Sequence, residues 1–261
     1  MTEDQRIEDM LALAHRVRSR ILVLIDEINA IPDELGPIAN AFTTWRVALL
    51  TLIWDVSEAP LVLASSRSES YRAMRIITRS LFEYAVHLEF YVYDRIGAIR
   101  DWHNSQSWLK GVVKGGVGQP ELLKMTKDER RAYNEMMRID GAFEYSDFSF
   151  MLRTVFKRRG YDRKEVKRAV RQATNFYTVS SSLVHGSQGA FYDLFTHVTD
   201  SEWKLHHRSF RIDRARVVYE ATSYLILALF AESLHRKKDL SADMHLRELD
   251  LITGDWEPIL G

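Results

Sequence analysis

The 261-residue chain has no cysteine, five prolines and twelve glycines. The absence of cysteine excludes disulfide bonds, thiolate catalysis and cysteine-based zinc sites, and it fits a reducing compartment. Few prolines and glycines leave long stretches uninterrupted, which favours helix. The chain has no net charge, because 36 basic residues balance 36 acidic ones. Binding to nucleic acid or to an anionic membrane would therefore need a local patch.

Long apolar runs are missing too. The run from Ala221 to Ala231 is flanked by Glu220 and Glu232 and is too short to cross a bilayer. The run from 47 to 64 contains two acidic residues and a proline. The charged, acidic start of the chain differs from a signal peptide. The sequence therefore predicts a soluble, cytoplasmic protein without membrane contact.

What is present is helical periodicity, with large aromatic anchors and no alternating strand pattern of useful length. We predict an all-α helical bundle with an N-terminal helical extension. The expected division is an N-terminal helical segment (1–36), a bundle domain (37–240) and a C-terminal tail (241–261). For residues 190–198 we favour a helix, with a strand as the alternative. Helices are expected at 2–30, 38–56, 66–99, 121–139, 146–158, 162–185, 212–235 and 246–251, with a further short helix starting at Pro60.

The helix expected at 66–99 carries a polar stripe on an otherwise apolar surface. Arg79, Glu83 and His87 stand four residues apart, so they line up along one side. Buried charges are costly unless they are paired. Two interpretations are open: a structural ion pair that fixes helix register, or part of a functional site.

A second polar stripe has the same spacing on the helix expected at 162–185. Tyr177, Ser181 and His185 stand at the border between an apolar and a basic side of that helix. A histidine at a helix end often stabilises the last carbonyl groups, and this interpretation stands beside a catalytic one. We predict that this stripe meets Arg79 and Glu83.

Local charge is concentrated between Arg153 and Arg171, where nine residues are basic and two are acidic. Such a run is often a solvated face, but it also suits a phosphate backbone. In the second interpretation, Lys164, Arg168 and Arg171 contact RNA.

The glycine-rich stretch 101–120 is predicted to be a surface loop or lid. A phosphate-binding loop is excluded there because Val117-Gly118 stand where such a loop requires Lys followed by Ser or Thr. A di-iron bundle requires two Glu-x-x-His motifs on facing helices, and no such pair of motifs occurs. No His-Glu-x-x-His occurs either, so no metal and no cofactor are expected.

Two short motifs carry a resemblance. Arg-Ser-Leu-Phe-Glu at 79–83 and Ser-Ser-Leu-Val-His-Gly-Ser at 181–187 resemble a bacterial family of helical proteins known as a domain of unknown function. The resemblance covers roughly residues 45–235. It implies an all-helical fold whose signature positions are Arg79, Glu83, Ser181, His185 and Gly186.

A more remote resemblance is to the HEPN superfamily, which includes prokaryotic ribonuclease toxins and phage-defence proteins. The usual HEPN signature is an arginine followed by a histidine after four to six residues, and none of the nine histidines here has it. The resemblance implies cleavage only if Arg79 supplies the arginine from another helix.

Two functions are therefore expected. The first is a binding or self-associating module, a homo-oligomer such as a dimer or one with a protein partner, whose polar cluster is structural. The alternative is a metal-independent ribonuclease. In that case His185 acts as general acid or base, Arg79 stabilises the scissile phosphate, Glu83 holds Arg79, and Tyr177 or Ser181 orients His185.

Overall fold

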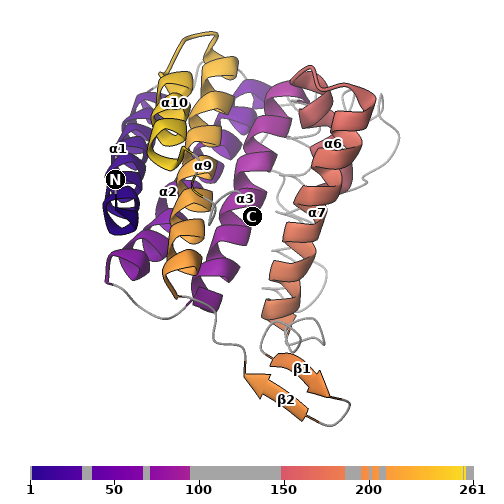
Figure 1. Ribbon diagram of the computed structural model, residues 1–261. Helices are drawn as coiled ribbons and strands as arrows, with labels where there is room; N and C mark the ends of the chain where they lie inside the picture. The colour runs from indigo at the N-terminus through magenta and orange to yellow at the C-terminus, as the bar shows by residue number, and fades with distance from the viewer. Residues whose placement is uncertain are drawn as a thin grey trace, which may run out of the picture.

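The computed structural model describes residues 2–30, 37–66, 71–94, 148–185, 195–199, 202–205, 210–254 and 256. Within these ranges the chain forms seven helices and one two-stranded sheet (Figure 1). The helices are α1 (Glu3–Asn29), α2 (Pro37–Ser65), α3 (Tyr71–Tyr93), α6 (Phe148–Arg158), α7 (Arg163–His185), α9 (Phe210–Arg236) and α10 (Ala242–Thr253). The strands are β1 (Phe195–Thr199) and β2 (Glu202–Leu205). The predicted all-α bundle is confirmed, with a small β-hairpin added to it.

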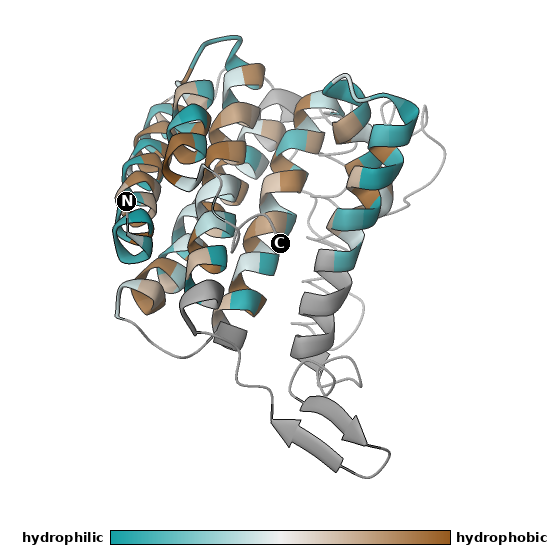
Figure 2. Cartoon of the chain, in the orientation of Figure 1, coloured by the Kyte–Doolittle hydropathy of each residue, from teal (hydrophilic) through white to brown (hydrophobic). Residues whose placement is uncertain are grey.

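Four long helices, α1, α2, α3 and α9, form the body of the molecule. The helix α10 packs against α1 and α9, while α6 and α7 form a helical hairpin that packs against α3 on the other side (Figure 1). Brown, apolar segments gather between the four long helices, and teal, polar segments gather on the outside and on the described part of α7 (Figure 2). The core therefore lies inside the four-helix body.

The first helix begins where the sequence predicts it to. The Thr2 hydroxyl accepts a hydrogen bond from the Gln5 backbone N–H at 3.2 Å and so caps α1. Ten of its residues are buried, and they belong to the same core as α2, α3 and α9. The segment predicted as an N-terminal extension thus shares the bundle core. The predicted tail contains α10, whose C-terminal carbonyls at Ile252 and Thr253 accept hydrogen bonds from Arg6.

The second helix does not stop before Pro60, where we expected a new helix to begin. It continues through Pro60 to Ser65. Proline lacks the N–H that would bond four residues back, which costs about 3 kcal/mol in a helix interior. Ile53, Leu61 and Ala64 are all buried in one core, so continuous apolar burial on both sides of Pro60 outweighs that lost bond.

The expectation of helix first at 190–198 is wrong from Phe195 onward. Phe195–Thr199 pairs antiparallel with Glu202–Leu205, with Phe195 opposite Leu205 and His197 opposite Trp203. Phenylalanine, threonine and valine make up most of β1, and tryptophan stands in β2; these residue types favour extended backbone. The helix expected at 121–139 and the loop expected at 101–120 lie outside the described residues.

Two stretches, Phe42–Ser65 and Arg214–Arg236, are long and apolar enough to cross a membrane by length and composition alone. Core helices of a soluble bundle pass the same test, so this is weak support for a membrane segment. The outer side of α2 carries exposed Asp55 and Glu58, while α9 buries Glu232 completely. Absence of membrane contact stays a prediction.

Candidate functional site

The polar stripe on α3 is half-buried. Arg79 Nη2 lies 3.9 Å from Glu83 Oε2, and the two side chains are 17% and 32% exposed. Burial raises the pKa of the Glu83 carboxyl above its usual range, and the nearby Arg79 charge opposes that rise. Arg79 and Glu83 therefore form a long ion pair. The effect of burial on the pKa of Glu83 is larger than the opposing effect of the Arg79 charge.

His87 belongs to an aromatic cluster. Its ring centroid lies 5.7 Å from that of Tyr91 and 6.3 Å from that of Phe148, the first residue of α6. Burial lowers the pKa of His87 to about 4, so the ring is neutral near pH 7. The third residue of the stripe is thus part of the packing between α3 and α6.

The most deeply buried charge on α3 is one that we did not single out. Glu89 is fully buried and receives two hydrogen bonds from Arg159, at 2.7 Å from Nε and 2.5 Å from Nη2. Arg159 follows the last residue of α6, and its guanidinium lies 5.6 Å from the Phe230 ring centroid on α9. This bidentate pair fastens the α6–α7 hairpin to the bundle. Its sequence signal is a lone acid inside the apolar run of α3.

Other buried arginines are paired as well. Arg46 on α2 donates to Glu232 on α9 at 3.0 and 2.6 Å, and both side chains are almost completely buried. Arg75 on α3 lies 2.8 Å from Glu220 on α9. Arg214 donates to Glu8 on α1 at 2.9 Å. Sequence spacing gives no sign of these pairs because their members are far apart along the chain.

The second predicted stripe lies on the C-terminal half of α7. Tyr177 and Ser181 are in this helix, and His185 is its last residue. The helix α7 packs against α3, and Figure 1 shows the two helices side by side. The side chains beyond residue 175 lie outside the described residues. Whether His185 meets Arg79 and Glu83 therefore stays a prediction.

The clearest surface feature is the basic surface of the α6–α7 hairpin. Eight of the nine basic residues between 153 and 171 are exposed, and the ninth, Arg159, is the one that binds Glu89. In the described part of the chain, none of the eight forms an ion pair. We call this set the basic hairpin surface: Arg153, Lys157, Arg158, Arg163, Lys164, Lys167, Arg168 and Arg171.

The two acidic residues in this segment, Asp162 and Glu165, cap the N-terminus of α7. Asp162 Oδ1 accepts hydrogen bonds from the backbone N–H groups of Lys164 and Glu165, at 2.7 and 2.9 Å. Glu165 Oε2 accepts one in return from the Asp162 N–H at 2.8 Å. This reciprocal arrangement is a capping box. Both carboxylates thus serve the backbone, and neither pairs with a cation of the basic hairpin surface.

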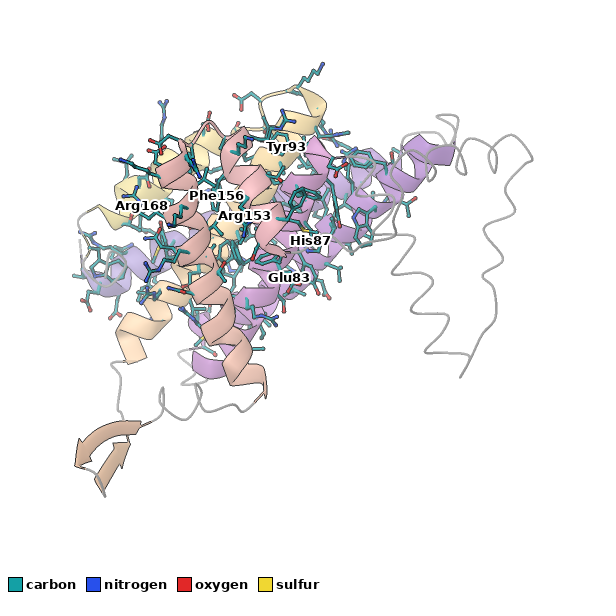
Figure 3. All side chains as sticks on the ribbon, turned by 90° about the vertical axis from the view of Figure 1, so that its right-hand side faces the viewer. Glu83, His87, Tyr93, Arg153, Phe156 and Arg168 are labelled. Atoms are coloured by element: carbon teal, nitrogen blue, oxygen red, sulfur yellow. The ribbon has the colours of Figure 1, made fainter. Side chains whose placement is uncertain are left out.

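The cations are arranged in rows. Lys164, Lys167, Arg168 and Arg171 follow helical spacing on α7 and cover about 10 Å at 1.5 Å per residue. Arg153 and Lys157, four residues apart, form a second row on α6. Val170 and Ala173 of α7 pack against the core instead. Figure 3 looks onto this side of the molecule, with Arg153 and Arg168 labelled on the two helices.

Within the described part of the chain, no group of three or more His, Cys, Asp or Glu side chains could hold a metal ion. Comparisons with protein-family models, with curated proteins and with solved structures find no match to this chain. The resemblances named above therefore stay predictions, and the function has to be argued from the geometry of the chain.

Proposed function

We propose that this chain binds the phosphate backbone of nucleic acid, RNA in the first place, through the basic hairpin surface. The observation that carries the proposal is the set of eight exposed cations without a carboxylate partner in the described structure. They lie on one helical hairpin of a chain whose net charge is zero. Phosphate contacts from Lys and Arg supply most of the affinity of non-specific nucleic-acid binding.

A solvated helix face without a partner would be expected to mix charges of both signs. The helix α1 does so: Arg16 pairs with Glu248, and Glu27 pairs with Arg236. On α7, by contrast, like charges stand four residues apart at Arg163 and Lys167 and again at Lys167 and Arg171. Each such pair costs a helix about 0.2–0.5 kcal/mol. A bound polyanion relieves this repulsion, whereas nothing in the described fold does.

The test is fluorescence anisotropy with a labelled RNA and a DNA of the same sequence, at several salt concentrations. If all eight cations meet phosphates of a single strand, log affinity should fall against log salt with a slope of about −5.6, or about 0.7 per cation. The double variant Lys167→Gln/Arg171→Gln should reduce that slope by about 1.4. Glutamine has a helix propensity close to that of lysine and arginine, so the helix is preserved.

The matched control is Lys237→Gln/Arg247→Gln, which removes two exposed cations from the other side of the bundle. It should leave both the affinity and the salt slope unchanged. No binding at low salt, or an equal loss in both double variants, would overturn the proposal. A difference between the RNA and DNA arms identifies the preferred nucleic acid.

A second candidate function is cleavage of the bound RNA, favoured by the packing of α7 against α3. The helix α7 carries His185, and α3 carries Arg79 and Glu83. His185 would act as acid or base while Arg79 would stabilise the phosphate. RNA incubated in the presence of a chelator should then be cut by the wild type and remain intact with His185→Ala. Binding without cutting would leave the first function alone. Self-association stays a prediction that size measurement of the same samples tests.

A further inference from the structure

In the part of the chain that the structure describes, exposed aromatic side chains are confined to the hairpin that carries the cations. Among the residues that the structure describes, Phe150 at 53% and Tyr161 at 42% are the exposed aromatic side chains. Both lie within the segment of the basic hairpin surface or directly before it. The described aromatic residues of the four-helix body are buried or half-buried.

The two rings stand at the ends of a row of cations. Phe150 precedes Arg153 by three residues and Lys157 by seven, so all three lie on one side of α6. Tyr161 follows the end of that helix. Its ring stacks on Phe156 with an interplanar angle of 8° and a centroid distance of 5.5 Å. Phe156 therefore covers one face of this ring, and the residue is still 42% exposed.

We propose that the basic hairpin surface takes single-stranded nucleic acid, with Phe150 and Tyr161 as stacking platforms for bases. This inference rests on the proposed function. Bases stack on aromatic rings only when they are unpaired and accessible, whereas a duplex offers its phosphates and hides the faces of its bases.

Both rings are held in place before a ligand arrives. The Phe150 ring makes an edge-to-face contact with Phe90, which is fully buried in the core, at a centroid distance of 6.1 Å. The Tyr161 ring rests on Phe156, which packs against the core. Anchored rings lose little conformational entropy when a base stacks on them.

A membrane surface is the other polyanion that a cationic and aromatic helix can meet, and the burial of α6 argues against it. An interfacial helix inserts a broad apolar face into the lipid boundary. The apolar face of α6, formed by Met151, Leu152 and Val155, is buried in the core. The two rings are then the main apolar groups left for contact, which suits individual bases better than acyl chains.

The experiment compares a single-stranded RNA of about ten nucleotides, within the range of about 4–16 that single-strand binding folds occupy, with a duplex of the same length. The wild type should bind the single strand more tightly than the duplex. Phe150→Ala and Tyr161→Ala should each lower affinity for the single strand about 5- to 150-fold, the equivalent of about 1–3 kcal/mol per stacked base. Affinity for the duplex should not change. Tyr161→Phe keeps the ring and should bind like the wild type.

The matched control is Leu251→Ala on α10, which trims a more exposed apolar side chain far from the hairpin and should change neither affinity. Equal affinity for single strand and duplex, unaffected by Phe150→Ala, would overturn this inference while the proposed function stands. Binding of neither RNA would overturn both. Vesicles of phosphatidylserine and phosphatidylcholine serve as a third ligand. Ring-dependent binding to them without RNA binding would also overturn both.

Discussion

The four-helix body and the α6–α7 hairpin differ in whether their basic side chains pair with carboxylates. In the body, Arg46, Arg75 and Arg214 each meet a carboxylate of another helix within 3.0 Å. On the hairpin, eight cations meet none in the described structure. The segment from 153 to 171 holds nine basic and two acidic residues, so the rest of this neutral chain is acidic by seven. Overall charge balance therefore conceals a strong separation of charge.

The difference has a physical reason. A charge inside the bundle must be paired because desolvation without a partner costs several kcal/mol, so folding alone explains its carboxylate. A charge at the surface has no such need, and folding explains neither its presence nor its clustering. Arg159 marks the boundary, because it is the one cation of the segment that has been drawn inward onto Glu89. Four predictions test this contrast between body and hairpin. They are ordered from the largest to the smallest expected change in the free energy of unfolding.

The largest effect is expected from Arg46→Ala. It leaves Glu232, which is fully buried, without its bidentate partner, and Arg236 Nε at 3.6 Å replaces only part of that contact. Removing one member of a buried pair costs about 3–5 kcal/mol. Urea unfolding should show this loss. The double variant Arg46→Met/Glu232→Leu removes both charges and should recover most of it, whereas an equal loss in both variants would show that packing rather than charge is responsible.

The second effect appears as a pH dependence. His87 has a pKa of about 4 in the folded state against an ordinary value of 6.5, because burial disfavours its charged form. The contribution of the neutral His87 ring to the free energy of unfolding is fully present above pH 6.5 and is lost as the pH falls from 6.5 towards 4. The difference between these two pKa values corresponds to about 3 kcal/mol of unfolding free energy. The difference in unfolding free energy between wild type and His87→Gln should therefore shrink as the pH is lowered from 7 to 4.

Subtracting the variant is necessary because other groups titrate in the same window. Burial raises the carboxyl pKa of both Glu83 and Glu220, so these two groups contribute stability that grows as the pH falls. A difference that stays constant across the window would mean that His87 is hydrated and titrates normally.

The sequence predicts the bundle well because helix formation follows local rules. The stripe of α1, the Thr2 cap and the Asp162 cap are each visible within a few residues. It predicts poorly where packing decides, as in the continuation of α2 through Pro60 and the pairing of β1 with β2. Periodicity ranks these segments by local preference, and long-range burial or strand pairing overrides that preference.

The candidate site shows the same limit. The run of cations is local, so the sequence reveals it, but which of them is turned inward depends on Glu89, seventy residues earlier. The stripe of Arg79, Glu83 and His87 is local too, but the contact of the His87 ring with Phe148 from another helix is not visible in that spacing. Exposure of Phe150 and Tyr161 follows from tertiary packing and has no sequence signal.

The third effect concerns the junction between the two regions. Glu89→Gln keeps the size of the side chain, but only its amide oxygen can accept a hydrogen bond from Arg159, because its NH2 group is a donor. One of the two charge-assisted hydrogen bonds is therefore lost and the other is weakened. Hydrogen bonds to charged groups contribute about 1.5–3 kcal/mol, and a loss in this range is expected in urea unfolding. Hydrogen exchange should rise first in α6 and α7, because this pair fastens the hairpin to α3. Faster exchange spread evenly over α1 and α2 would contradict that role.

The smallest effect has the opposite sign. Lys167 stands four residues from both Arg163 and Arg171, so Lys167→Glu removes two repulsions and creates two attractive spacings. Thermal unfolding should show a gain of about 0.8–2 kcal/mol, with Lys167→Gln between the wild type and the glutamate variant. RNA affinity should fall in the reverse order, because a phosphate contact is first lost and then made repulsive. A residue whose replacement strengthens the fold and weakens binding is retained for binding. A loss of stability in Lys167→Glu would instead assign this cation to the fold and weaken the contrast between body and hairpin.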